Sequence, residues 1–260
     1  MNEISNMALY RPSRKSDEAI VPRKPANNAP SGAAESVEGR ASTKRNASEC
    51  VRGQTQSWDN TMSRLARVRE SAVRHRKQSF TALLHHLTPS LLEESFYQLK
   101  RAAAEGVDDV SWREYEEDLG RRLADLHQRI HTGRYRPRPA RRVFIPKADG
   151  TKRPLSILSI EDKIVQQAIV TVLNQIYETD FLGFSYGFRP QRSQHDALDA
   201  LAWSITRKRV NWVLDLDIQK FFDTVDHEWL IRMIRHRVQD KRLIKLIVRW
   251  IKVGVVDEAG

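Results

Sequence analysis

The sequence predicts an α+β fold in which helices flank a single β-hairpin. Helical periodicity dominates on both sides of residues 140–157, where it gives way to two short strand-like runs. These runs, residues 142–147 and 152–157, enclose Asp149-Gly150, a pair that favours a hairpin turn. The order of helices, hairpin, helices, one strand and final helices is typical of the α+β class.

The composition indicates which kind of partner and which cell compartment to expect. Lys and Arg number 44 against 33 Asp and Glu, which favours a polyanionic partner because cations at phosphates release counterions. Ribosomal and membrane-surface proteins share this excess. The sequence lacks an apolar run of roughly 18 residues and a signal-peptide core, and its single cysteine is Cys50. We therefore expect a bacterial cytoplasmic protein without a membrane partner.

Residues 1–57 are expected to form a disordered basic arm. They contain one leucine, Leu9, and no phenylalanine among many Ser, Ala, Asn, Pro and basic residues. This apolar surface is too small to offset chain entropy. Both a nucleic-acid tether and a solvated tail fit the arm.

Polar caps and glycines set the boundaries of the predicted helices. A basic helical pattern covers residues 61–87, and Thr88 caps a helix that continues towards Gly106. Gly133 closes a third helix, and residues 211–216 read as a strand. The other predicted caps are Ser111, Ser159, Ser193, Asp226 and Asp240.

Asp215 and Asp217 are two residues apart, so a strand would place both carboxylates on the same face. Adjacent like charges need a compensating cation, and magnesium prefers one or two carboxylates together with substrate phosphates. The backbone carbonyl of Ile218 can add an oxygen ligand. An acidic strand end facing solvent, with Asp223 capping a turn, explains the segment equally well.

Short motifs follow one another in a fixed order along residues 91–258. They are Leu99-Lys100-Arg101, Gly106-Val107-Asp108, Arg134-Tyr135-Arg136-Pro137, Ile145-Pro146-Lys147, Arg153-Pro154-Leu155, Asp162-Lys163-Ile164-Val165-Gln166, Ser185-Tyr186-Gly187-Phe188-Arg189-Pro190, the block from Asp217 to Asp223, and Asp226-His227-Glu228-Trp229-Leu230. Together they resemble the reverse transcriptases, or maturases, encoded by group II introns. The resemblance implies a truncated right-hand polymerase, with an N-terminal extension and helical fingers in residues 58–208 and the start of the palm in residues 209–260.

The resemblance also implies roles for individual residues. Asp217 matches the first metal-binding aspartate of the palm, with the Ile218 carbonyl beside it. Phe222 matches the side chain that packs under the nucleotide sugar and excludes a 2′-hydroxyl. Lys147 and Arg153 match finger residues that hold the triphosphate, and a solvated hairpin tip is the alternative.

A second set of residues is assigned to template or intron RNA: Arg64, Arg67, Arg141, Arg142 and Arg189. A solvated helix face is the alternative for Arg64 and Arg67. We expect at least one of Tyr186 and Phe188 to lie in the core.

Two-metal catalysis needs further carboxylates facing Asp217, so that two Mg²⁺ ions flank the reacting phosphate. In the family these belong to an aromatic-Ala-Asp-Asp turn downstream of the Asp217 block, which the sequence up to Gly260 does not contain. Asp108-Asp109 only looks similar, and the family usually has glycine at the position of Asp109. We therefore expect this chain to be inactive as a polymerase on its own.

Two functions remain open from the sequence. The first is a part of an RNA-directed DNA polymerase that adds dNTPs to a DNA primer on an RNA template, completed by a downstream-encoded second half. The second is an RNA-binding, maturase-like remnant that assists intron RNA folding without polymerisation. A retron-type or defence-linked reverse transcriptase shares the palm pattern, although the Tyr-Gly-Phe-Arg-Pro motif favours introns.

Overall fold

A computed structural model of the chain describes residues 52–146, 150, 152–208 and 210–257, with side chains described from residue 60 onward. Most of the expected arm, and Lys147, lie outside the described residues. The chain divides into two compact units, Asp180–Gln219 and, in the described part, residues 52–179 with 220–257. Each unit is described by itself.

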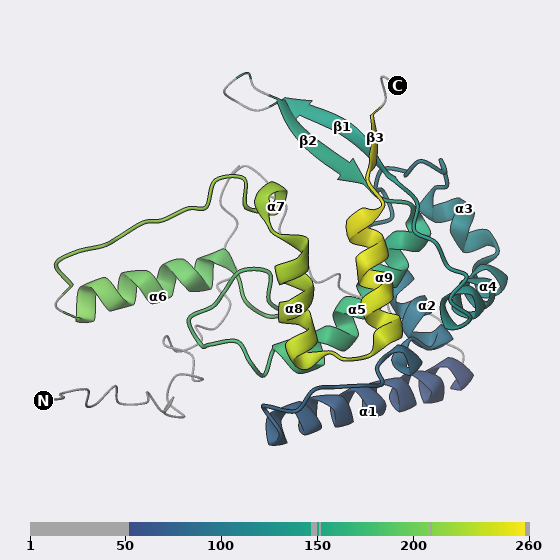
Figure 1. Cartoon of the computed structure of the whole chain (residues 1–260), viewed down its shortest axis with the longest axis horizontal. Helices are drawn as coiled ribbons and strands as arrows, with labels where there is room; N and C mark the ends of the chain where they lie inside the picture. The colour runs from purple at the N-terminus through teal and green to yellow at the C-terminus, as the bar shows by residue number, and fades with distance from the viewer. Residues whose placement is uncertain (1–51, 147–149, 151, 209, 258–260) are drawn as a thin grey trace, which may run out of the picture. The chain divides into compact units, whose positions relative to one another are not determined.

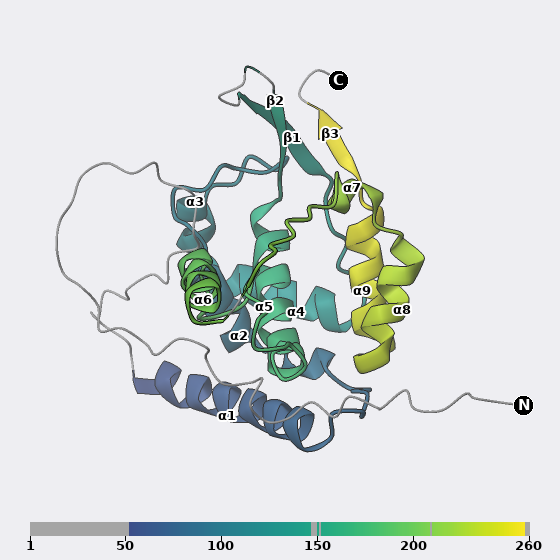
Figure 2. The ribbon, with the colours of Figure 1, turned by 90° about the vertical axis from the view of Figure 1, so that its left-hand side faces the viewer.

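Helices make up most of the larger unit (Figure 1). They are α1 (Arg52–Arg74), the 3-10 helix η2 (Leu84–His86), α2 (Pro89–Tyr97), α3 (Trp112–Glu117), α4 (Leu119–His131), α5 (Ile160–Tyr177), α7 (Phe221–Thr224), α8 (His227–Arg237) and α9 (Lys241–Lys252). The long helix α5 is central, because Ile164, Val165 and Val172 along it are completely buried and both α1 and α2 pack on it. Helices α8 and α9 lie side by side in both views (Figure 2).

The predicted caps are confirmed. Thr88 accepts a hydrogen bond from the backbone N–H of Leu91, with Pro89 at the first helical position. Ser111, Ser159, Asp226 and Asp240 cap α3, α5, α8 and α9 in the same way. Each side-chain oxygen satisfies a backbone donor that has no partner inside its helix.

Two helices end earlier than predicted, because other groups take their backbone carbonyls. Helix α2 stops at Tyr97, where the Phe96 carbonyl accepts from Leu99 N–H and from the Trp112 indole at 3.3 Å. Helix α1 runs from Arg52 to Arg74, so it begins inside the expected disordered arm of residues 1–57 and does not reach residue 87. Beyond it, the buried guanidinium of Arg237 donates to the carbonyls of residues 75, 76 and 78.

The hairpin is confirmed, and it carries a third strand that the sequence did not predict. Strand β1 (Ala140–Pro146) pairs antiparallel with β2 (Lys152–Ile157). Strand β3 (Val255–Asp257) pairs parallel with the start of β1, which gives the order β2-β1-β3. Figure 1 shows the hairpin projecting from the helices of this unit. The combination of helices with one small sheet confirms the α+β class.

The smaller unit contains α6 (Gln194–Arg207), which begins with the capping box of Ser193 and Asp196. The predicted strand at residues 211–216 is wrong, because these residues have no regular secondary structure. A strand needs partners for its backbone groups, and no described strand pairs with this segment.

Within the described ranges, no helix has the length and apolar character that crossing a lipid bilayer requires.

Asp240 joins α9 to a distant segment of the chain. One carboxylate oxygen accepts from the N–H groups of Leu83 and Leu84 at 2.7 and 2.9 Å, and the other accepts from Arg242 and Leu243 at the start of α9. Burial alone would raise the pKa of Asp240, but these four backbone donors lower it below the ordinary value of 3.8.

Gly106 lies where the loop after α2 crosses the start of α5. A Cβ added at Gly106 would lie 2.6 Å from both Cα and N of Ser159. Those are backbone atoms of a capped helix and cannot turn away, so the position excludes every side chain.

We predict that Gly106→Ala lowers the free energy of unfolding by about 2 to 3 kcal/mol, because the methyl group overlaps backbone. Gly120→Ala is the matched control, since a Cβ there meets nothing within 4 Å and alanine favours the helix. Urea denaturation followed by circular dichroism measures both. Equal stability of the two variants would contradict the proposed contact.

We predict that Asp240→Asn lowers the free energy of unfolding by about 3 kcal/mol at neutral pH, because an amide cannot accept from all four donors. The folded-state pKa of Asp240 lies below the ordinary 3.8, so its contribution is present above that pH and disappears as pH falls through the folded pKa. The difference in free energy of unfolding between wild type and variant should therefore become smaller in acid.

Denaturant titrations at neutral and at acidic pH measure that difference. Asp226→Asn is the control, because Asp226 is exposed, caps α8 through one backbone bond, and asparagine caps equally well. If the difference in free energy of unfolding between wild type and Asp240→Asn does not depend on pH, the charge of Asp240 is not what stabilises the fold.

Candidate functional site

The hairpin presents Arg153 to solvent. Arg153 lies in β2 opposite Ile145, and its side chain is exposed. Phe144 and Ile145 on β1 are 54% and 46% exposed, so the outer half of the hairpin lies outside the core. An exposed guanidinium on a projecting hairpin can bind a phosphate with several hydrogen bonds. The structure does not describe its expected partner, Lys147.

The arginines at the base of the hairpin contact the protein itself. Arg141 donates to the carbonyl of Glu105 at 2.6 Å, and a second guanidinium nitrogen lies 3.8 Å from an Asp109 carboxylate oxygen. Arg142 lies 3.6 Å from Asp257 of β3. The structure thus places Arg141 and Arg142, both predicted to bind RNA, in contacts that hold the hairpin base.

The Asp108-Asp109 pair has a structural explanation. Asp108 lies 3.5 Å from Arg138 and its side chain is only 6% exposed. Asp109 has a φ of 50°, in the left-handed region that glycine adopts without strain. This backbone agrees with glycine as the usual residue at that position in the resembling family, and aspartate is among the side chains that tolerate it.

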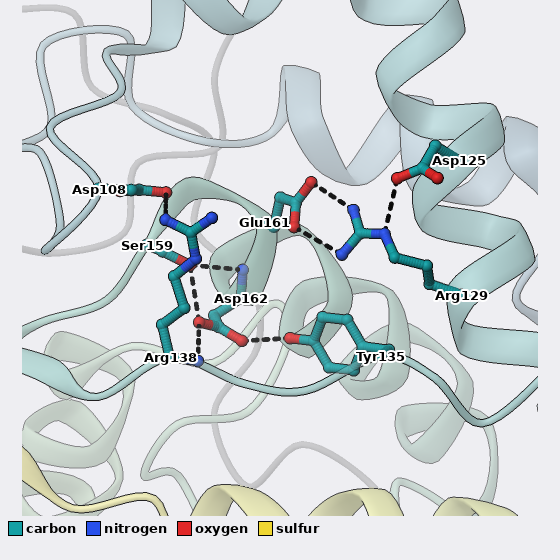
Figure 3. A network of polar contacts seen from close by, with 8 residues as sticks. All are labelled: Asp108, Asp125, Arg129, Tyr135, Arg138, Ser159, Glu161 and Asp162. Atoms are coloured by element: carbon teal, nitrogen blue, oxygen red, sulfur yellow. Dashed lines mark hydrogen bonds and ion pairs between the residues drawn. The ribbon is translucent and has the colours of Figure 1, made fainter.

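A buried carboxylate fixes both ends of the hairpin (Figure 3). Asp162, which is 1% exposed, accepts from the Ser159 hydroxyl at 2.7 Å and from the Arg138 backbone N–H at 3.1 Å. The Tyr135 hydroxyl and, at 3.4 Å, the Trp250 indole donate to its other oxygen. Burial first, and then the negative charge of Asp162, raise the pKa of Tyr135, which keeps its hydroxyl protonated as a donor.

A neighbouring ion-pair cluster joins α4 to α5 (Figure 3). Arg129 donates to both oxygens of Glu161, at 2.6 and 3.1 Å, and to Asp125 at 2.6 Å. Burial alone would lower the pKa of Arg129, but the hydrogen bonds and charges of Glu161 and Asp125 raise it. Bidentate geometry of this kind fixes orientation as well as distance.

The Asp217 segment is open to solvent. Asp215 and Asp217 are exposed, and Ile218 beside them is 66% exposed. Among the described residues, no group of three or more His, Cys, Asp or Glu side chains is arranged to hold a metal ion. Asp217 therefore offers a hard oxygen ligand without a described set of further ligands around it.

Phe222 projects from the short helix α7 and is 78% exposed. Its ring meets that of Phe221 edge-on, with centroids 5.4 Å apart. Lys220, which precedes the helix, has a φ of 51° and turns the chain sharply at this point. Asp217 belongs to the Asp180–Gln219 unit, whereas Phe222 and Arg153 belong to the larger unit, so their mutual placement is not described.

Arg189 is held within its own loop. Its guanidinium donates to the carbonyls of Leu182 and Ser185 at 2.9 and 2.8 Å and lies 4.9 Å from the ring centre of Phe181. Neither aromatic residue beside it joins the core: Tyr186 is half-buried, and Phe188 is 98% exposed with a φ of 56°.

Arg64 and Arg67 are exposed on α1 and line a cavity that also contains His86. No sequence pattern gave a site role to His86 or Asp162. The sequence could have indicated that His86 is buried, because it lies between Leu84 and Leu87, which are both buried. For Asp162, it was the spacing of three residues from the cap Ser159.

Comparison with known proteins identifies relatives. Residues 145–258 match the family described as reverse transcriptase (RNA-dependent DNA polymerase). Protein YkfC of Escherichia coli is 40% identical over 161 residues, which is 61% of this chain and 42% of that protein. The group II intron-encoded protein LtrA of Lactococcus lactis is 32% identical over 202 residues, 76% of this chain and 33% of LtrA.

A third relative is also named for an intron. The putative COX1/OXI3 intron 1 protein of Saccharomyces cerevisiae is 33% identical over 140 residues, 53% of this chain and 16% of that protein. The aligned part of the chain thus spans less than half the length of each of these curated relatives. By these matches, the chain belongs to the family of reverse transcriptases and maturases encoded by group II introns.

Proposed function

We propose that this chain supplies the fingers and the first palm carboxylate of an RNA-directed DNA polymerase. In the complete enzyme, dNTPs are added to a DNA primer on an RNA template. The observation that carries the proposal is the extent of the reverse-transcriptase match, residues 145–258, which includes both the Arg153 strand and the Asp217 block. The fingers and N-terminal extension occupy residues 58–208, and the palm begins in residues 209–260.

Arg153 and Lys147 bind the triphosphate of the incoming nucleotide in this proposal. The exposed side chain of Arg153 on a projecting strand supports it, because a guanidinium donates several hydrogen bonds to phosphate oxygens. Phe222, five residues after Asp217, packs under the sugar. A phenyl ring acts there by shape alone, so it needs no hydrogen bond to reject a 2′-hydroxyl.

Asp217, with the backbone carbonyl of Ile218, would hold Mg²⁺. An exposed carboxylate and a carbonyl are the hard oxygen ligands that this ion prefers. Bound Mg²⁺ neutralises charge that develops on the reacting phosphate. We propose that the remaining carboxylates come from a second, downstream-encoded segment, because the described residues contain no further acidic cluster.

A second function rests on α1. This helix carries exposed Arg64 and Arg67, which suit contact with RNA phosphates. An RNA-binding maturase that assists intron folding without polymerising would need this surface and not Asp217. Intron splicing assayed with Arg64→Gln and with Asp217→Asn tests this function, since an RNA-binding maturase loses splicing activity in the first variant and keeps it in the second.

We predict that the 260-residue chain alone gives no primer extension on an RNA template with a DNA primer, dNTPs and Mg²⁺. Asp217 and Asp215 are too few to hold two ions about 4 Å apart. A full-length group II intron reverse transcriptase serves as the positive control. Magnesium-dependent DNA synthesis by the purified chain would contradict this prediction.

We predict that Arg153→Gln weakens binding of a fluorescent dNTP about tenfold, since it removes charge-assisted hydrogen bonds to the triphosphate. Lys152→Gln is the matched control, because Lys152 is exposed in the same strand but points to the opposite face. Fluorescence anisotropy measures both affinities. Equal losses would mean that the hairpin attracts nucleotides only through its net charge.

A further inference from the structure

A cavity of about 480 Å³ lies between α1 and the segment from Phe80 to His86. Arg64, Arg67 and His85 are exposed, and therefore form its rim. Val68, Leu83 and His86 are buried, and therefore form its floor. Such a volume lies within the range of small-molecule sites, which is about 300 to 1,000 Å³. The cavity is charged at its mouth and mostly apolar below.

The two rim arginines are available to an anion. Arg64 and Arg67 are three residues apart on α1, so they project from the same side of the helix. Within the described part of the chain, neither guanidinium has an ion-pair partner. Ser71, one turn further along α1, adds a hydroxyl to the same lining. Two adjacent guanidinium groups are suited to a phosphate, which accepts hydrogen bonds from both.

His86 supplies an unsatisfied polar group on the floor. It is 8% exposed, and its Nδ1 atom has no hydrogen-bond partner among the described residues. Burial first, and then the positive charges of His85, Arg64 and Arg67, lower the pKa of His86 to about 4. The ring is therefore neutral at neutral pH, with one donor and one acceptor nitrogen. Nδ1 itself is closed to solvent, so a ligand in the cavity would bond to the other ring nitrogen, Nε2.

We propose that this cavity receives one unstacked nucleotide of a single-stranded RNA. The phosphate lies between Arg64 and Arg67, and the base lies on the apolar floor, where His86 forms a hydrogen bond with its edge. The proposal rests on the RNA partner proposed above and adds where and how that RNA is held. A nucleotide fits the lining better than an acidic peptide does, because it combines an anion with a flat, largely apolar ring that carries hydrogen-bonding edges.

Binding of a short, 5′-labelled single-stranded RNA to the purified chain tests this site. Arg64→Gln and Arg67→Gln should each weaken binding about tenfold, because each removes charge-assisted hydrogen bonds to one phosphate. Arg69→Gln is the matched control: it removes the same charge from an exposed position of α1 that does not line the cavity. Arg69→Gln should weaken RNA binding by less than about threefold. Equal losses at the three positions would overturn the proposal.

A second measurement reports on the floor without altering it. Single-stranded RNA should shift the side-chain nitrogen resonances of His86 in the wild-type chain, and this shift should be lost in Arg64→Gln. Duplex RNA, whose bases stay stacked, should leave His86 unchanged. A shift of His86 with duplex RNA or with a polyglutamate peptide, or none with single-stranded RNA, would overturn the assignment.

These measurements need neither dNTPs nor Mg²⁺. Failure of the cavity proposal therefore leaves the Arg153 and primer-extension results intact, and the converse also holds.

Discussion

The buried carboxylate of Asp162 is the interaction on which the described architecture of the larger unit depends. Its donors come from segments on both sides of the hairpin, since Arg138 precedes β1 and Ser159 follows β2. The Tyr135 hydroxyl and the Trp250 indole add the segment after α4 and the last turn of α9. A buried charge is costly unless it is fully hydrogen-bonded, so these segments must meet for the carboxylate to be stable. Asp162 therefore helps to set the direction in which the hairpin projects, together with the contacts of Arg141 and Arg142 at its base.

Local features of the fold were predictable from the sequence, and pairings between distant segments were not. Caps such as Thr88 and Ser159 need only a few neighbouring residues, so their chemistry can be read directly. Strand β3 pairs with β1 across more than a hundred residues, and nothing in its three residues marks that partner. Residues 211–216 were predicted as a strand and do not form one, because a short apolar run does not guarantee a partner strand.

The candidate site likewise contains features that the sequence predicted and features that it could not predict. Motif order identified Asp217, Phe222 and Arg153, and their roles stay proposals because the two units are described separately. Charge alone could not show that Arg141 and Arg142 have acceptors on their own chain. The cavity beside Arg64 was invisible in the sequence, since it depends on how the segment after α1 turns back beneath that helix.

The contact between Asp240 and the N–H groups of Leu83 and Leu84 constrains the order in which the protein can fold. The partners are 157 and 156 residues apart. At typical rates of synthesis, a ribosome needs about 8 to 31 s to add the intervening residues. During that interval the segment after α1 lacks its acceptor and exposes apolar side chains to the cell. A nascent chain of this protein therefore waits seconds before this contact can form, and its exposed apolar segment favours chaperone binding during that time.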